Sequence, residues 1–204
     1  LVLADVYQGR NMTGVQRGDI QRLLVLEQLP KPVNFSGGMW PTSEGGTFTL
    51  ARILGTVPVA ADGSACFEVP AIRPVFFVAL DKDGLSVQRM HSFTSVMPGE
   101  TTGCVGCHES RLAARDISGK RLDAMQRPPS VLAPIENIPD VMDFPRDVQP
   151  ILDKLCVPCH NPARMEGNVD FSGDHTPLFS VSYLTLLRHG LIADGRNEPA
   201  GNRP

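Results

Sequence analysis

The feature that most constrains this chain of 204 residues is a pair of Cys-x-x-Cys-His motifs. They read CVGCH at 104–108 and CVPCH at 156–160. This spacing is the attachment sequence of c-type haem. Two thiols about one turn apart can add to the two vinyl groups along one porphyrin edge, while the next residue places an imidazole over the iron. The sequence therefore predicts two covalently bound haem c groups.

In this interpretation the cysteines anchor the porphyrins and the histidines are the proximal iron ligands. The predicted cofactor-binding residues are Cys104, Cys107, His108, Cys156, Cys159 and His160. A zinc ribbon also has two Cys-x-x-Cys pairs, but its gap is about 15–20 residues. Here 48 residues separate Cys107 from Cys156, and zinc would leave the histidines unexplained. A thioredoxin-like redox pair needs a single motif beside a βαβ unit, which the pattern does not offer.

Each iron can take a sixth ligand, and three further histidines are candidates. They are His91, which precedes the first motif, and His175 and His189, which follow the second. Methionines are second choices, because they more often fill cores; these are Met90, Met97 and Met165. An open sixth position, which would allow chemistry at the iron, is the remaining possibility.

Two other residue types bear on the predicted haem groups. Arginines near the motifs can donate charge-assisted hydrogen bonds to propionates, or they are ordinary surface charge. These arginines are Arg89, Arg111, Arg115 and Arg188. Cys66 lies outside both motifs, within a strand-like run, and we expect it to be a small buried hydrophobic residue.

The first half of the chain has the pattern of β-strands. Short runs rich in Val, Leu, Ile and Phe alternate with turn residues. The runs cover 1–7, 20–28, 47–54, 65–69, 75–80 and 85–91. Asp62-Gly63 and Lys82-Asp83-Gly84 are hairpin signals between neighbouring runs. We expect an antiparallel, sandwich-like module over 1–98, with Phe67, Phe76 and Phe77 in its core.

The pattern changes after Pro98-Gly99. Short helices are predicted at 109–114, at 143–155 with Asp143 as cap, and at 180–189 before Gly190. The proline-rich stretch 127–139 between them can be neither continuous helix nor central strand. The predicted fold class is therefore mixed: a β module followed by a loop-rich, mainly α dihaem cytochrome c domain over 99–204.

Charge and hydropathy exclude several classes of function. The net charge is −3, with no cluster of positive residues, which argues against a nucleic-acid partner. No apolar run reaches 18 residues, so we expect no transmembrane segment. The chain starts in a strand-like run without a signal peptide, and we expect it to be an internal piece of a longer protein.

The order of these segments resembles the C-terminal part of hydrazine synthase alpha-subunit-like proteins of planctomycetes. The matching stretches run through nearly the whole chain. They are ADVYQG at 4–9, LVLEQ at 24–28, DGSACFEVPA at 62–71, ALD at 79–81, VQRM at 87–90, PGE at 98–100, CVGCHESR at 104–111 and the second motif. The resemblance implies two c-type haems and an exported protein, periplasmic or in an equivalent compartment.

The resemblance also implies an unusual first haem site, from which this chain departs. In the enzymatic member, which makes hydrazine from nitric oxide and ammonia, the motif histidine turns toward zinc. A tyrosine four residues later takes the iron. Here the fourth residue after His108 is Leu112, which cannot ligate iron. We therefore expect His108 to be an ordinary proximal ligand. We expect this chain to share the family's fold and haems but not its hydrazine-forming reaction.

Two functions remain open at this point. The first is electron transfer by a dihaem region between the longer protein and a redox partner protein or further subunits of a complex. The alternative is a haem oxidoreductase of the hydrazine synthase type, acting on small nitrogen species at one open haem. The sequence does not decide whether the chain is an enzyme.

Overall fold

The structure is a computed structural model that describes residues 1–9, 12–30, 50–90, 92–107 and 121–192. By its internal contacts the chain divides into two compact units. The described residues of the first unit lie within 1–29 and 51–140, and those of the second are 141–192 together with Pro30 and Leu50. The sequence predicts a domain boundary at residue 98, between a β module and a haem-bearing region. This boundary stays a prediction.

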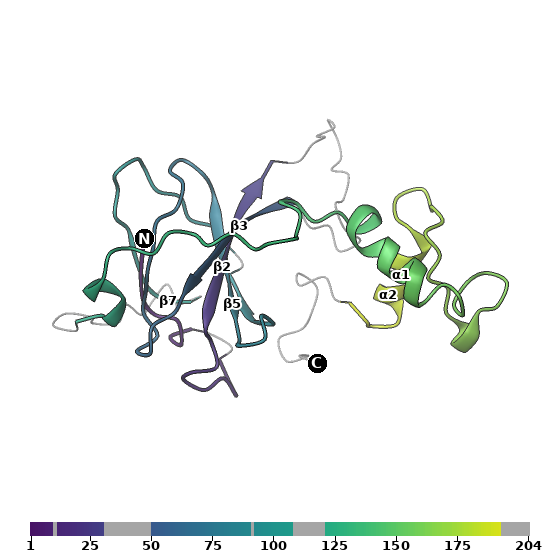
Figure 1. Cartoon of the computed structure of the whole chain (residues 1–204), viewed down its shortest axis with the longest axis horizontal. Helices are drawn as coiled ribbons and strands as arrows, with labels where there is room; N and C mark the ends of the chain where they lie inside the picture. The colour runs from purple at the N-terminus through teal and green to yellow at the C-terminus, as the bar shows by residue number, and fades with distance from the viewer. Residues whose placement is uncertain (10–11, 31–49, 91, 108–120, 193–204) are drawn as a thin grey trace. The chain divides into compact units, whose positions relative to one another are not determined.

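The first unit is built from strands that form two sheets (Figure 1). The strands are β1 (Val2–Asp5), β2 (Arg22–Leu29), β3 (Leu50–Pro58), β4 (Ala65–Cys66), β5 (Val75–Leu80), β6 (Ser86–Arg89) and β7 (Gly103–Gly106). One sheet has the order β3-β2-β5-β6 and the other has the order β4-β1-β7. The first six strands fall within or next to the predicted runs, whereas β7 was not predicted.

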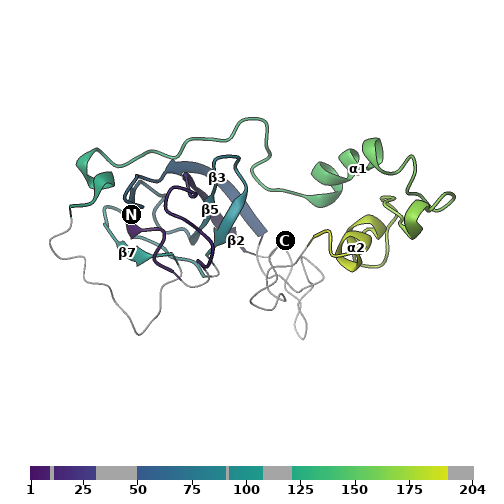
Figure 2. The ribbon, with the colours of Figure 1, turned by 90° about the horizontal axis from the view of Figure 1, so that it is seen from below.

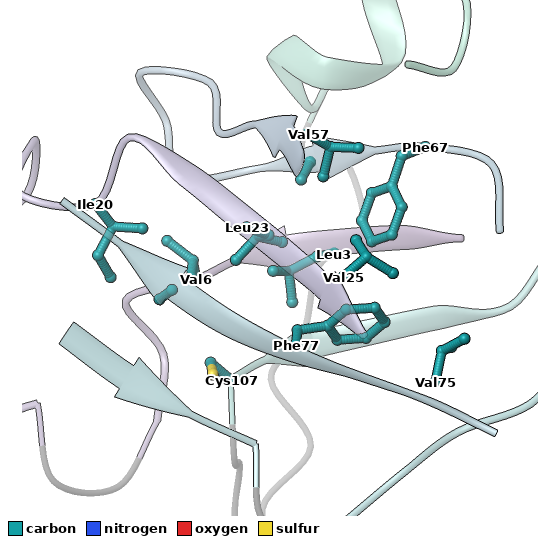
Figure 3. Close-up of a cluster of buried hydrophobic side chains, with 12 residues drawn as sticks. Leu3, Val6, Ile20, Leu23, Val25, Val57, Phe67, Val75, Phe77 and Cys107 are labelled. Carbon is teal, nitrogen blue, oxygen red and sulfur yellow. The ribbon is translucent and has the colours of Figure 1, made fainter. Parts of the chain in front are cut away.

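The core lies between these strands and is apolar. Leu23 and Val25 of β2 face the same cluster as Val75 and Phe77 of β5, in agreement with the period-2 alternation of the two strands. Phe67 is 1% exposed and packs edge-to-face on Phe77, with ring centroids 5.5 Å apart (Figure 3). The predicted core phenylalanines Phe67, Phe76 and Phe77 are all buried.

The proline-rich segment 127–139 runs along this unit in extended form. Ser130 bridges to Phe67, and Ala133 exchanges two backbone hydrogen bonds with Thr56, at 2.8 and 2.9 Å. A 3₁₀ turn at Asp123–Gln126 precedes it. The proline-rich stretch is thus an extended connector, as predicted, and it is held by backbone hydrogen bonds.

The second unit contains two short helices that lie side by side in both views (Figures 1 and 2). A π-helical turn at Phe144–Val148 leads into α1 (Gln149–Leu155), and α2 is Val181–Arg188. Asp143 caps the first by accepting a hydrogen bond from the Arg146 N–H, 2.9 Å. Ser180 caps α2 by accepting from the Tyr183 N–H, and Gly190 ends it with a φ of +65°. The predicted helix at 109–114 lies outside the described residues.

The predicted fold class is wrong. The described residues are mainly β, in two sheets, and their α-helices are only the two short ones, so the C-terminal part is not a mainly α dihaem domain. Pro150 lies in the first turn of α1, where proline is tolerated, and Pro158 just beyond its end prevents α1 from continuing. The strands are not all antiparallel either, since β7 pairs with β1 in parallel. Among the described residues no helix combines the length and apolar character needed to cross a membrane.

Candidate haem-attachment site

The second motif lies on a turn that begins where α1 ends. The Cys156 N–H still donates to the Leu152 carbonyl at 2.8 Å, but Pro158 stops the helix there. The chain then tightens, because the N–H groups of Cys159 and His160 both donate to the Cys156 carbonyl, at 3.1 and 2.9 Å. This turn places Cys156 and Cys159 three positions apart on one turn of the backbone, and both thiols are free and half-buried. That is the arrangement required by two thioether bonds to one porphyrin edge.

The His160 ring is oriented by a backbone hydrogen bond. Its Nδ1 lies 2.7 Å from the Glu166 carbonyl oxygen. Because a carbonyl can only accept, Nδ1 carries the proton, and in the neutral ring Nε2 keeps the lone pair. Iron-ligating histidines commonly donate their other N–H to such a carbonyl, which makes the imidazole a stronger donor. With the proton on Nδ1, the Nε2 atom of His160 could serve as the predicted iron ligand.

The loop that supplies this carbonyl is shaped by Asn161. Its side-chain amide donates to the Val157 carbonyl at 2.8 Å, and its oxygen accepts from the N–H groups of Ala163 and Arg164. The loop then turns back through Met165, which has a left-handed φ of +38°. Together these contacts bring the Glu166 carbonyl back to the His160 ring, six residues along the chain.

The apolar side chains around this motif are largely exposed. Phe171 is the buried hydrophobic side chain among the described residues of the second unit, and the other buried residues there are Gln149, Ser180 and Ser182. Ile151 is 56% exposed and Leu155 is 70% exposed on α1, which leads into Cys156. A porphyrin held at Cys156 and Cys159 would supply apolar surface that the polypeptide lacks. The second motif thus fits the predicted cofactor.

The first motif has a different conformation, because it forms β7 rather than a turn. Cys104 pairs with Leu3 of β1, and Gly106 pairs with Asp5. Cys104 is half-buried and packs against the β core, so the protein partly covers the position that a porphyrin would need there. Cys107 is only 8% exposed and borders the same core as Phe77 and Val6 (Figure 3). In its described conformation the Cys104–Cys107 segment does not fit the predicted cofactor, and His108 lies outside the described residues.

Burial changes the acid–base behaviour of Cys107. Desolvation, with a smaller contribution from Cys104, raises the pKa of the Cys107 thiol from 9.0 to about 11. The folded chain therefore keeps this proton when the unfolded chain has lost it. The resulting stability is fully present below pH 9 and disappears as the pH rises toward 11. A neutral, buried thiol is also a poor nucleophile.

We expect Cys107 to resist alkylation by iodoacetamide at pH 8 in the native protein and to react after denaturation. Native protection follows from its burial and raised pKa. Peptide mass spectrometry after labelling before and after unfolding measures the difference, with half-buried Cys66 as the reference thiol. If Cys107 stays unlabelled after denaturation because its peptide carries a porphyrin, the first motif attaches haem as the sequence predicts. The description of Cys107 as a free, buried thiol would then be wrong.

The candidate sixth ligands that the structure describes are spread over both units. His91 lies outside the described residues, and His175 and His189 are both exposed in the second unit. Met90 packs against the β core, Met97 is 62% exposed in the first unit, and Met165 is 43% exposed in the loop after His160. Distal ligation therefore stays a prediction.

The other side chains singled out from the sequence have ordinary roles where they are described. Arg89 stacks over the Phe76 ring, with its Cζ 5.2 Å from the centroid, and Arg188 is exposed in the last turn of α2. Arg111 and Arg115 lie outside the described residues. Cys66 on β4 is half-buried rather than fully buried.

Sequence reasoning missed the residues that support His160. Phe171 packs edge-to-face on the His160 ring at 5.5 Å, and Gln149 holds the Phe171 carbonyl. No local pattern identifies either residue, because their partners are 11 and 22 positions away. The conformation of the first motif was missed for a similar reason: its pairing partner is the N-terminal strand.

Comparisons with known proteins agree on one family. Residues 11–109 match the family model described as the hydrazine synthase alpha subunit middle domain. Hydrazine synthase subunit alpha of Kuenenia stuttgartiensis is 25% identical over a 248-residue alignment, which covers 89% of this chain and 31% of that protein.

A solved structure of Kuenenia stuttgartiensis hydrazine synthase has the same fold. It matches 91% of this chain and 33% of that chain, with a TM-score of 0.69 and 20% identity. The chain thus spans about one third of the length of these relatives. Residues 11–109 match the family's middle domain, and all three comparisons support a hydrazine synthase alpha-like protein.

Proposed function

We propose that this chain carries a covalently attached haem c at Cys156 and Cys159 and transfers electrons within a hydrazine synthase alpha-like protein. The observation that carries the proposal is the geometry of the second motif. The two thiols share one turn, and His160 presents Nε2 while the Glu166 carbonyl holds Nδ1 at 2.7 Å. A haem bound there would supply reversible one-electron transfer.

The residues of the second unit contribute to this function in separate ways. Cys156 and Cys159 would prevent the cofactor from dissociating, and His160 would be the proximal ligand. The Glu166 carbonyl fixes the tautomer and strengthens the imidazole as a donor, which favours the ferric state. The exposed Ile151 and Leu155 offer apolar surface next to the motif and would limit access of water.

The sequence predicts a second haem at the first motif, and this stays a prediction. It rests on the residue pattern at 104–108, whereas Cys107 lies against the β core. We also propose an exported location, periplasmic or equivalent, in keeping with the family resemblance. The relatives are named as a subunit of hydrazine synthase and as that enzyme, which supports further subunits or a redox protein as partners here.

The alternative function is catalysis on small nitrogen species at an open haem. It is favoured by the name of the relatives and is opposed by Leu112, which stands where a ligating tyrosine would be needed. An electron-transfer haem has both axial positions filled, whereas a catalytic one leaves a position for substrate.

Spin state and gas binding separate the two functions. We expect a low-spin ferric spectrum and no carbon monoxide complex after reduction of the purified haem-loaded protein, because a six-coordinate iron has no free position. Optical titration with carbon monoxide measures this directly, with a His-ligated, five-coordinate haem protein as the positive control. A high-spin ferric signal together with a one-to-one carbon monoxide complex would favour the catalytic alternative.

A further inference from the structure

The centre of the second unit is a buried polar cluster. Gln149 is 7% exposed, Ser180 is 6% exposed and Ser182 is fully buried. Buried polar groups cost free energy unless their hydrogen bonds are made, and here they are made within the cluster. Ser182 Oγ lies 2.5 Å from Gln149 Oε1 and 3.0 Å from Ser180 Oγ. This cluster joins α1 to α2.

Gln149 has a second set of contacts on its amide nitrogen. Nε2 donates to Asp153 Oδ1 at 2.8 Å, one turn along α1, and to the Phe171 carbonyl at 3.0 Å. The chain packs tightly there, since a Cβ added at Gly173 would lie 3.1 Å from Gln149 Cγ. One side-chain amide therefore connects both helices to the segment that carries Phe171.

Phe171 in turn contacts the proposed iron ligand in two ways. Its N–H donates to the His160 carbonyl at 2.9 Å, and its ring meets the His160 ring edge-to-face, at 5.5 Å and an angle of 69°. Phe171 is itself 8% exposed, so its position is restricted. The path from Gln149 to the imidazole contains only one intervening residue.

We propose that Gln149 is a positioning residue, which sets the orientation of the His160 imidazole through Phe171. The inference rests on the proposed ligation of a haem by His160. A fixed ring keeps Nδ1 on the Glu166 carbonyl and aims Nε2 in one direction. Outer partners of this kind tune the donor strength of a ligand, and therefore the potential and the spectrum of the metal.

The test is Gln149→Leu in the full haem-loaded chain. Leucine is close in size but cannot bond to Ser182 or to the Phe171 carbonyl, so the restraint on Phe171 is lost. We expect the haem-to-protein ratio to stay at the wild-type value, because Cys156 and Cys159 are unchanged. The low-spin ferric electron paramagnetic resonance signal of this haem should broaden and shift, and its midpoint potential should rise as the Nδ1 hydrogen bond weakens.

Two further variants keep the result interpretable. Ser172→Ala removes a side-chain hydrogen bond to Asp174 in the same segment without touching the path, and it should leave both signal and potential unchanged. Phe171→Leu keeps the backbone hydrogen bonds but removes the ring contact. It should shift the signal and raise the potential, as expected for Gln149→Leu. This variant therefore tests the path even if Gln149→Leu does not fold.

The outcomes distinguish this inference from the proposed function. Wild-type protein without haem on Cys156 and Cys159 would overturn the proposed function. Haem-loaded wild type, with the signal and potential unchanged in the variants that fold, would overturn the positioning role of Gln149 alone.

Discussion

Replacing Cys156 and Cys159 together with serine is expected to remove all covalent haem from the second motif. Serine cannot form the thioether bonds to the vinyl groups, and His160 alone cannot retain the cofactor during purification. In-gel haem staining and absorbance per protein should show loss of this group. Cys66→Ser, outside both motifs on β4, is the control and should keep the wild-type haem content.

The same double substitution should also unfold much of the second unit. Among its described residues, Phe171 is the buried hydrophobic side chain, while Ile151, Leu155, Leu178 and Leu191 are each at least 52% exposed. Covering one such side chain is worth about 1.5–3 kcal/mol, and the polypeptide alone does not cover them. Limited proteolysis should cleave within 141–192 and spare the β unit. A haem-free double variant as protease-resistant as wild type would contradict this.

Gly106→Ala is expected to lower the free energy of unfolding of the β unit by about 3 kcal/mol. A Cβ at Gly106 would overlap the Gln8 carbonyl oxygen, which is backbone and cannot rotate away. A Cβ at Gly9 would likewise overlap the Cys107 carbonyl oxygen. The backbones of residues 8–9 and 106–107 therefore pack directly against each other. Relief of the overlap would pull β7 from β1. Thermal unfolding followed by circular dichroism should show a fall in Tm of roughly 10 °C.

Gly103→Ala is the matched control in the same strand. A Cβ at Gly103 would meet only the Val2 carbonyl oxygen, at 3.8 Å, which is an ordinary contact. Its unfolding free energy should stay within about 0.5 kcal/mol of wild type. Equal stability of the two variants would mean that β7 does not pack on β1 as described.

Local sequence patterns were sufficient to predict strands whose pairing partner is close in the sequence. β5 and β6 form a hairpin at the predicted turn, where Asp81 accepts from the N–H groups of Asp83 and Leu85 and Gly84 has a φ of +81°. The turn chemistry there is encoded within five residues. The capped helix at 180–189 was predictable for the same reason, because Ser180 and Gly190 mark its ends.

The same patterns failed where distant residues decide the conformation. β7 has the sequence Gly-Cys-Val-Gly, which carries little β-propensity, and its only described partner strand is β1, about 100 positions earlier. The motif identifies the side chains needed for attachment, since the chemistry demands those residue types. It does not determine whether the backbone turns, as at Cys156, or extends, as at Cys104.

The central claim is that Cys156 and Cys159 are bonded to one porphyrin, and the tryptic peptide that contains both cysteines tests it most directly. It should be isolated from protein made in a host that attaches haem c. Mass spectrometry of this peptide should find a single haem joined through both sulfurs, with His160 unmodified. Recovery of the peptide with two free, alkylatable thiols would contradict the account.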